Sequence, residues 1–127
     1  MKRGISVMLA ILFLVSSFAF AGQKEKIAVA ANDKTPAASV SSQAGRSPFF
    51  LFFDEKGKLI EAIPNPYKEA ERSGTAVADF LSGKGVTVVV AEEYGPQIVG
   101  VMKGKGIRTV PFKGSVEEAV KKVLKSN

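Results

Sequence analysis

The chain contains no cysteine, no histidine and no tryptophan. Without cysteine it can form no disulfide, no thiolate nucleophile and no cysteine-ligated cluster, so the fold has to be stabilised by packing alone. Without histidine the usual zinc sites and the Ser-His catalytic pair are excluded as well. A bound metal would have to be a hard cation held by carboxylate and carbonyl oxygens. These absences remove most catalytic classes.

The N-terminus has the three parts of a secretory signal peptide. Lys2 and Arg3 give a positive start, and the run from Ile5 to Phe18 is apolar except for three serines. Residues 19–21 (Ala-Phe-Ala) then form the small-residue pattern that signal peptidase accepts. The alternative is a retained membrane anchor, but the run is shorter than the ~20 residues that span a bilayer and lacks a basic stop-transfer flank. We predict cleavage after about Ala21, secretion to the periplasm, and no stable membrane insertion afterwards.

The remaining residues, 22–127, suffice for one domain. They contain all 12 acidic residues and all the basic ones except Lys2 and Arg3. The lysines are spread through turns and expected helix ends, and they do not form a basic stripe interleaved with aromatic residues. We therefore expect a mildly basic, solvated surface and predict neither nucleic acid nor an anionic membrane as a partner.

Short apolar runs alternate with amphipathic segments along the mature chain. Strands are predicted at 27–31, 49–53, 59–63, 86–91 and 107–112, and helices at 67–81, at 96–104 and after a capping box formed by Ser115 and Glu118. Residues 54–58 form a hairpin turn, and Pro64 and Pro66 mark the third strand as an edge strand. The two later βα units require right-handed crossovers and parallel pairing to the first strand. This order predicts a three-layer α/β domain around a mixed five-stranded sheet.

Ligands of open α/β sheets gather beyond the carboxyl ends of the strands, where the strand order reverses. Two segments are expected to meet there. One is the loop 32–47, which is unusually long for a connector. The other is the turn 92–95, just before a helix N-terminus whose free N–H groups can receive an anion, although Glu92 and Glu93 oppose one.

Several segments resemble the dinitrogenase iron-molybdenum cofactor biosynthesis family. Residues 40–50 (VSSQAGRSPFF) resemble the family segment V-S-x-H-F-G-R-A-x-Y-F. Residues 65–66 resemble its E-N-P signature, 85–96 resemble its G-V-D-x-V-I-x-x-x-x-G-P segment, and 106–119 resemble its ending. The matches are collinear and span nearly all of 26–124. The chain thus resembles an exported member of this NifX-like family.

The resemblance implies a ribonuclease-H-like fold and a binding role rather than catalysis. Members of the family are carriers or chaperones for iron–sulfur-based nitrogenase cofactors, so an iron–sulfur or iron–molybdenum cofactor is implied by the resemblance alone. Gln43 stands where the family usually has His, and Ala44 where it has Phe, so an imidazole contact to a cluster is not carried over. Nitrogenase cofactor assembly is cytoplasmic, whereas this chain carries an export signal. The ligand is therefore expected only to be small and anionic or metal-containing.

The candidate ligand-binding residues lie in the two segments that are expected to meet. They are Ser41, Ser42, Gln43, Gly45, Arg46, Glu92, Tyr94 and Gly95. Arg46 offers a planar fork of donors for an anion, and its alternative role is a structural cap of the loop. Gly45 permits a tight turn, and Tyr94 is expected to be exposed before the helix. No catalytic residue and no metal ligand is predicted.

Three alternative interpretations remain open from the sequence. Asp33 and Glu92 are expected at the ends of neighbouring strands, where a carboxylate pair holding Mg²⁺ would suit a nuclease, although Asp33 is equally a turn former. The four phenylalanines in 49–53 suggest a stacking platform for bases, but strand alternation and two covered faces favour core packing. The third alternative is a protein-interaction module with a degenerate ligand site, which docks a partner through its loops.

Overall fold

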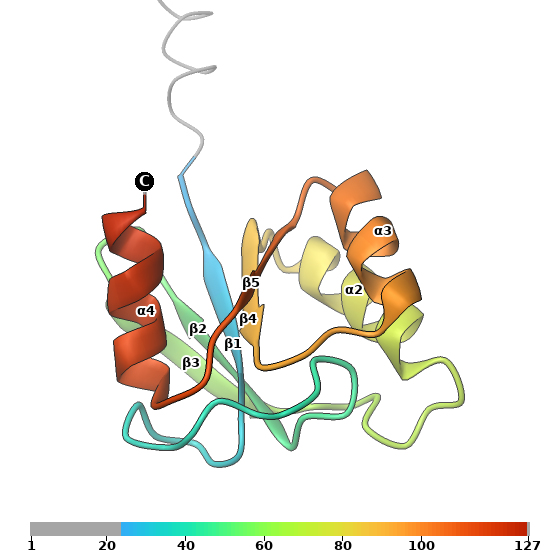
Figure 1. Cartoon of the computed structure of the whole chain (residues 1–127), viewed down its shortest axis with the longest axis horizontal. Helices are drawn as coiled ribbons and strands as arrows, with labels where there is room; N and C mark the ends of the chain where they lie inside the picture. The colour runs from blue at the N-terminus through green and yellow to red at the C-terminus, as the bar shows by residue number, and fades with distance from the viewer. Residues whose placement is uncertain (1–23, 127) are drawn as a thin grey trace, which may run out of the picture.

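The structure is a computed structural model that describes residues 24–126 (Figure 1). The predicted signal peptide lies outside the described residues. The strands are β1 (Ile27–Ala31), β2 (Phe49–Phe53), β3 (Leu59–Pro64), β4 (Val88–Ala91) and β5 (Arg108–Pro111), and the helices are α2 (Ser73–Gly83), α3 (Pro96–Gly104) and α4 (Val116–Lys125). Within residues 24–126, no helix has the length and apolar character needed to span a membrane.

The five strands form one mixed sheet in the order β3-β2-β1-β4-β5. The hairpin strands are antiparallel, with β2 between β1 and β3, whereas β4 lies parallel to both β1 and β5. Helices α2 and α3 cover one face of the sheet and α4 covers the other (Figure 1). The predicted element order, the parallel pairing of the first strand and the edge position of β3 are confirmed. The three-layer α/β fold of the ribonuclease-H-like type is confirmed with them.

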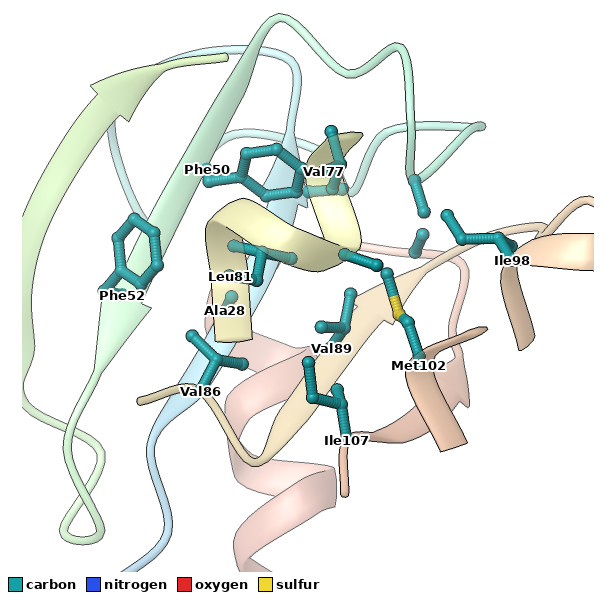
Figure 2. Close-up of a cluster of buried hydrophobic side chains, with 14 residues drawn as sticks. Ala28, Phe50, Phe52, Val77, Leu81, Val86, Val89, Ile98, Met102 and Ile107 are labelled. Atoms are coloured by element: carbon teal, nitrogen blue, oxygen red, sulfur yellow. The ribbon is translucent and has the colours of Figure 1, made fainter. Parts of the chain in front are cut away.

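Alternate residues of β2 build the two cores on either side of the sheet. Phe50 and Phe52 pack with α2 and α3, and Figure 2 shows them beside Val77 and Leu81. Leu51 and Phe53, which face the other side of the sheet, instead pack against α4. Both labelled phenylalanines are completely buried, which contradicts the alternative of an aromatic platform for bases. The core role predicted from strand alternation is confirmed.

Helix α2 begins at Ser73 and not at Tyr67 as predicted. The reason is a polar turn that precedes it. The side-chain oxygen of Asn65 accepts the N–H of Tyr67 at 2.9 Å, and the N–H of Ala70 donates to the Tyr67 carbonyl at 3.1 Å. The amide nitrogen of Asn65 also donates to the carbonyl of Gly45 at 3.0 Å. Side-chain bonds of this kind compete with helix formation, so the segment 67–72 forms turns.

Strands β4 and β5 are each shorter than predicted because their first apolar residues close a helix instead. The N–H of Val86 donates to the Leu81 carbonyl at 3.1 Å, and the N–H of Ile107 donates to the Met102 carbonyl at 2.8 Å. In both places the preceding residue is a glycine with a positive φ, which is 77° at Gly85 and 76° at Gly106. This is the glycine-closed helix end in which a buried apolar residue covers the last turn. At the other edge of the sheet, β3 extends one residue beyond its predicted end, to Pro64.

Helix α4 begins with the predicted capping box. The Ser115 hydroxyl accepts the N–H of Glu118 at 3.1 Å, and the N–H of Ser115 donates to the Glu118 carboxylate at 3.2 Å. The hydrogen bond from this backbone N–H is the main reason that the pKa of Glu118 lies below its usual value. The Ser115 hydroxyl donates to the same carboxylate at 2.9 Å and lowers the pKa further. The N–H groups of Val116 and Glu117 donate to the carbonyls of Ala38 and Pro36, each at 2.9 Å, so the start of α4 is satisfied by its own side chains and by the loop after β1 together.

Ser115→Ala is expected to lower the free energy of unfolding by about 1 kcal/mol, because an N-cap side chain is lost. Thermal unfolding followed by circular dichroism measures the change, and Ser115→Thr, which retains a hydroxyl cap, serves as the control. Since the pKa of Glu118 is lowered on folding, its contribution is present above the ordinary carboxyl pKa and lost as pH falls through the lowered one. The difference between wild type and Ser115→Ala should therefore shrink in acid, and a difference that grows in acid contradicts this account.

Candidate functional site

The loop after β1 and the turn after β4 meet at the carboxyl ends of these strands, as predicted. The N–H of Ser41 donates to the Ala30 carbonyl at 2.7 Å, so the returning loop runs beside the end of β1. On its other side, the N–H groups of Glu92 and Glu93 donate to the carbonyls of Ser41 and Ser42 at 3.0 and 3.1 Å. The loop thus continues the sheet beyond its strands and lies against the lead-in to α3.

A cleft of about 840 Å³ opens where this loop faces the N-terminal ends of α2 and α3. The two helices lie side by side with their N-terminal ends at the same end of the domain (Figure 1). Three segments line the cleft, namely 43–46 from the loop, 71–75 from the start of α2, and 93–98 from the start of α3. The cleft therefore lies beyond the carboxyl edge of the sheet, where the topology predicts a ligand.

Neither helix that borders the cleft has a side-chain cap. The N-cap residues are Arg72 for α2 and Gly95 for α3, and the first turns contain no acidic residue. The first N–H groups of a helix have no partner within it, and the helix dipole makes this end positive. In α4, by contrast, the capping box and the carbonyls of Pro36 and Ala38 occupy these groups. At the start of α3, Pro96 has no N–H, and the N–H of Ile98 donates to the Gly95 carbonyl at 3.2 Å. The start of α2 is therefore the main place where backbone N–H groups can receive an anion, and the dipole of α3 adds positive potential beside it.

Arg46 projects from the loop at the rim of this cleft. Its side chain is exposed, and its Nη1 donates to the carbonyl of Lys68 at 2.8 Å. That bond ties the loop to the turns before α2, which is the structural role considered for Arg46. A guanidinium has five N–H donors, so the remaining ones are available to a ligand. Arg72 adds a second guanidinium, and Glu71 and Glu93 oppose both with negative charge.

Gly45 allows the loop to pack directly on the first turn of α2. A Cβ at this position would lie 2.9 Å from the Oγ of Ser73 and 3.0 Å from the backbone nitrogen of Gly74. The carbonyl of Gly45 is held at the same time by the side chain of Asn65. The missing side chain thus sets the distance between the two walls of the cleft.

The expectation that Tyr94 is exposed is wrong. The side chain is half-buried, and its hydroxyl oxygen lies 2.7 Å from the Val110 carbonyl and 2.8 Å from the Val89 carbonyl. It also accepts the N–H of Val110 at 3.2 Å. Burial raises the pKa of Tyr94 far above its usual value. The ring borders the cleft, but its hydroxyl joins β4 to β5 and is not a free donor.

Comparison with known proteins identifies the family. The sequence profile of the family described as "Dinitrogenase iron-molybdenum cofactor" matches residues 25–126. The chain belongs to this family. No curated protein matches the chain.

Solved structures show the same α/β fold. The apo form of the orange protein from Desulfovibrio gigas is 23% identical, with a TM-score of 0.73, over 80% of this chain and 88% of that one. A Thermotoga protein described as a putative NifB protein is 26% identical, with a TM-score of 0.68, over 80% and 88% of the two chains. A putative dinitrogenase from Methanocaldococcus jannaschii is 8% identical, with a TM-score of 0.57, over 81% and 90%. The NifX-like resemblance read from the sequence is thereby supported.

The side chains that are present determine which kind of cofactor the cleft can bind. The chain has no histidine or cysteine, and residues 24–126 contain no cluster of three or more carboxylates arranged for a metal. An iron–sulfur cluster bonded to protein ligands therefore does not fit this cleft. An anionic cargo held by helix N–H groups and a guanidinium does fit.

Five of the candidate residues line the cleft and three do not. Gln43, Gly45, Arg46, Tyr94 and Gly95 line it, whereas Ser41, Ser42 and Glu92 are not among its lining residues. The Ser41 side chain is buried, and its hydroxyl donates to the carbonyl of residue 43 at 3.3 Å. Asp33, from the nuclease alternative, accepts the N–H of Lys34 in a local turn. Whether the five residues bind a ligand stays a prediction.

Sequence reasoning missed the wall formed by the start of α2. Its residues are Glu71, Arg72, Ser73, Gly74 and Thr75. The sequence pattern predicts this segment as the interior of a helix over 67–81, where an end with open N–H groups is not expected. Gly74 was the available signal, because a glycine inside a helical pattern lowers helix propensity and often has a packing or functional reason.

Proposed function

We propose that this family member is a non-enzymatic, extracytoplasmic binding or carrier domain whose cleft holds a small ligand, anionic or metal-containing. The observation that carries the proposal is that the uncapped start of α2, the positive end of α3 and Arg46 all border one cleft of about 840 Å³. Membership of a cofactor family supports a carrier role, and the N-terminal sequence supports export.

The physical basis for binding is complementary charge in a fixed geometry. Each helix N-terminus acts as roughly half a positive charge, and the N–H groups at the start of α2 are already oriented when the ligand arrives. Arg46 adds a charge-assisted donor on the facing wall. Glu71 and Glu93 weaken the attraction for a simple anion and favour a ligand whose charge is confined to one side. A metal-containing ligand would be held through its anionic groups, because the chain supplies no soft metal ligand.

The cleft is suited to holding a ligand more than to transforming one. Its donors are backbone N–H groups and guanidinium groups, which keep their protons at neutral pH. The phenol of Tyr94 keeps its proton as well, because its pKa is raised and its hydroxyl is bonded to backbone groups of the sheet. These groups stabilise negative charge without exchanging protons with it.

The test is native mass spectrometry of the exported protein, isolated anaerobically from its own host. We expect a reproducible extra mass, which gives the ligand's mass and metal content. Arg46→Ala should lose this mass, because removing a charge-assisted hydrogen bond costs about 1.5–3 kcal/mol, or roughly ten- to a hundredfold in affinity. Arg46→Lys, which keeps the charge but not the fork, should be intermediate.

Lys113→Ala is the matched control, since it removes one exposed positive charge from the same end of the domain outside the cleft. It should keep the bound mass and the ligand-dependent rise in melting temperature. A bound mass that survives Arg46→Ala with unchanged affinity overturns the assigned site. An apo mass in the wild type overturns the carrier proposal and leaves the protein-interaction alternative, for which crosslinking in the cell envelope is the measurement.

A further inference from the structure

The lysines that are scattered along the sequence gather at one end of the folded domain. All three helices run opposite to the parallel strands, so the C-terminal ends of the helices meet the N-terminal ends of β1, β4 and β5 (Figure 1). The β2–β3 turn joins them, because Phe53 pairs with Ile27. The Nζ of Lys26 donates to the carbonyl of Lys84, just after α2, at 2.8 Å. We call this end, formed by residues 24–26, 54–61, 79–84, 103–108 and 125, the basic pole.

Positive charge dominates the surface of the basic pole. Its exposed basic side chains include Lys56, Lys58, Lys103 and Lys125, and Lys24 pairs with Glu55 at 3.7 Å. Of its acidic side chains, Glu61 and Asp79 are already neutralised by Lys84 and Lys105, each at 2.6 Å. At the cleft end the balance is reversed, since acidic residues outnumber basic ones in the segments 32–48, 65–72, 92–95 and 112–118. The domain is therefore polarised along the direction of its strands.

The basic pole also exposes two large apolar side chains. Leu59 and Ile60 are 37% and 52% exposed and follow directly after Lys56 and Lys58 at the start of β3. Exposed aliphatic side chains among lysines match the boundary between lipid headgroups and acyl chains, where the apolar part is buried and the cations face phosphates. A nucleic acid offers phosphates but no aliphatic layer for Leu59 and Ile60.

The N-terminal segment joins the folded domain at the basic pole. The apolar run from Ile5 to Phe18 precedes the described residues, and the chain enters the fold through Lys24 in the basic pole. Residues 19–26 are eight in number and span at most about 28 Å when extended. If the apolar run is still in the bilayer when the exported domain has folded, the basic pole, and not the cleft, is therefore the part of the domain nearest to the bilayer.

The sequence alone predicts no anionic membrane as a partner, because its lysines are spread along the chain, but the fold gathers them at one end. We propose that the basic pole docks on a bilayer that contains anionic lipids. Lysine side chains contact the phosphates, and Leu59 and Ile60 enter the headgroup boundary. In this orientation the cleft at the opposite end faces away from the bilayer. The proposal does not depend on a ligand in the cleft, so either of the two can fail alone.

The experiment is co-sedimentation of the exported protein, its N-terminus established by intact mass, with lipid vesicles. One set of vesicles is phosphatidylcholine, and the other contains equal parts of phosphatidylcholine and phosphatidylglycerol. We expect binding to the anionic set only, and loss of binding at high salt. Lys56→Gln/Lys58→Gln/Lys125→Gln should weaken binding about a hundredfold, at about fivefold for each lysine. Ile60→Ser should weaken binding several-fold and leave its salt dependence unchanged.

The matched control is Lys34→Gln/Lys68→Gln/Lys113→Gln, which removes three exposed lysines from the cleft end and changes the net charge equally. It should bind the anionic vesicles as the wild type does. Equal losses in the two triple variants would show an effect of net charge alone and overturn the proposal. Equal binding to both vesicle sets overturns it too, as does salt-dependent binding to DNA or RNA without binding to vesicles.

Discussion

Phe50→Ala is expected to lower the free energy of unfolding by about 3–5 kcal/mol. The ring is completely buried between the sheet and α2, beside Val77 and Leu81 (Figure 2). Its loss removes apolar contacts and leaves a cavity that the surrounding strand and helix cannot fill. Since domains of this size are stable by about 5–15 kcal/mol, the variant should unfold at a far lower denaturant concentration. Urea titration followed by circular dichroism measures the shift.

Two further variants serve as controls for the effect of Phe50→Ala on stability. Phe50→Leu keeps most of the apolar volume and should cost less than half as much. Ile60→Ala removes an apolar side chain that is 52% exposed, so it should change stability by less than about 0.5 kcal/mol. If Phe50→Ala changed stability no more than Ile60→Ala does, the ring would not be part of the core and the aromatic-platform hypothesis would return.

Gly45→Val is expected to lower the free energy of unfolding by about 1–3 kcal/mol and to abolish ligand binding in the cleft. A Cβ would already be 2.9 Å from the Oγ of Ser73 and 3.0 Å from the nitrogen of Gly74, and the γ carbons add to this crowding. The loop must then move off α2 and carry Arg46 with it. Denaturant titration measures the stability, and native mass spectrometry measures the bound ligand.

A glycine at which a side chain meets open space provides the control. Gly100 lies on α3 with no atom within 4 Å of a Cβ, so Gly100→Ala should stabilise the protein by about 0.5–1 kcal/mol. The crowding itself is tested by combining Gly45→Ala with Ser73→Ala, because the second change removes the nearer of the two contacts. If Ser73→Ala brings no relief to Gly45→Ala, the contact does not set the width of the cleft.

The architecture was predictable because most elements depend on local patterns. Continuous apolar runs identified β1 and β2, and the capping box at Ser115 identified the start of α4. The start of α2 was not predictable in this way, because it depends on Asn65, whose side chain bonds both to its own turn and to the distant Gly45. Local sequence patterns carry no information about that second partner.

The location of the cleft could be predicted from the sequence, but the roles of several of its residues could not. Strand topology alone brings the loop after β1 to the turn after β4. The role of the Tyr94 hydroxyl was missed because its partners, Val89 and Val110, lie on two different strands. The clustering of the lysines was missed for a related reason, since spacing along the sequence does not show that three helix ends share one end of the sheet.

The central position of β1 has a consequence for the order in which the protein is assembled. Lys26, which leads into β1, and Thr87, which leads into its parallel neighbour β4, are 61 residues apart. A chain that emerges N-terminus first can close the hairpin of β2 and β3 early, but β1 then lacks one of its neighbours until most of the polypeptide exists. Long-range strand pairing of this kind is slow to form. The sheet of a nascent chain with this topology therefore stays incomplete until the polypeptide has been made past β4.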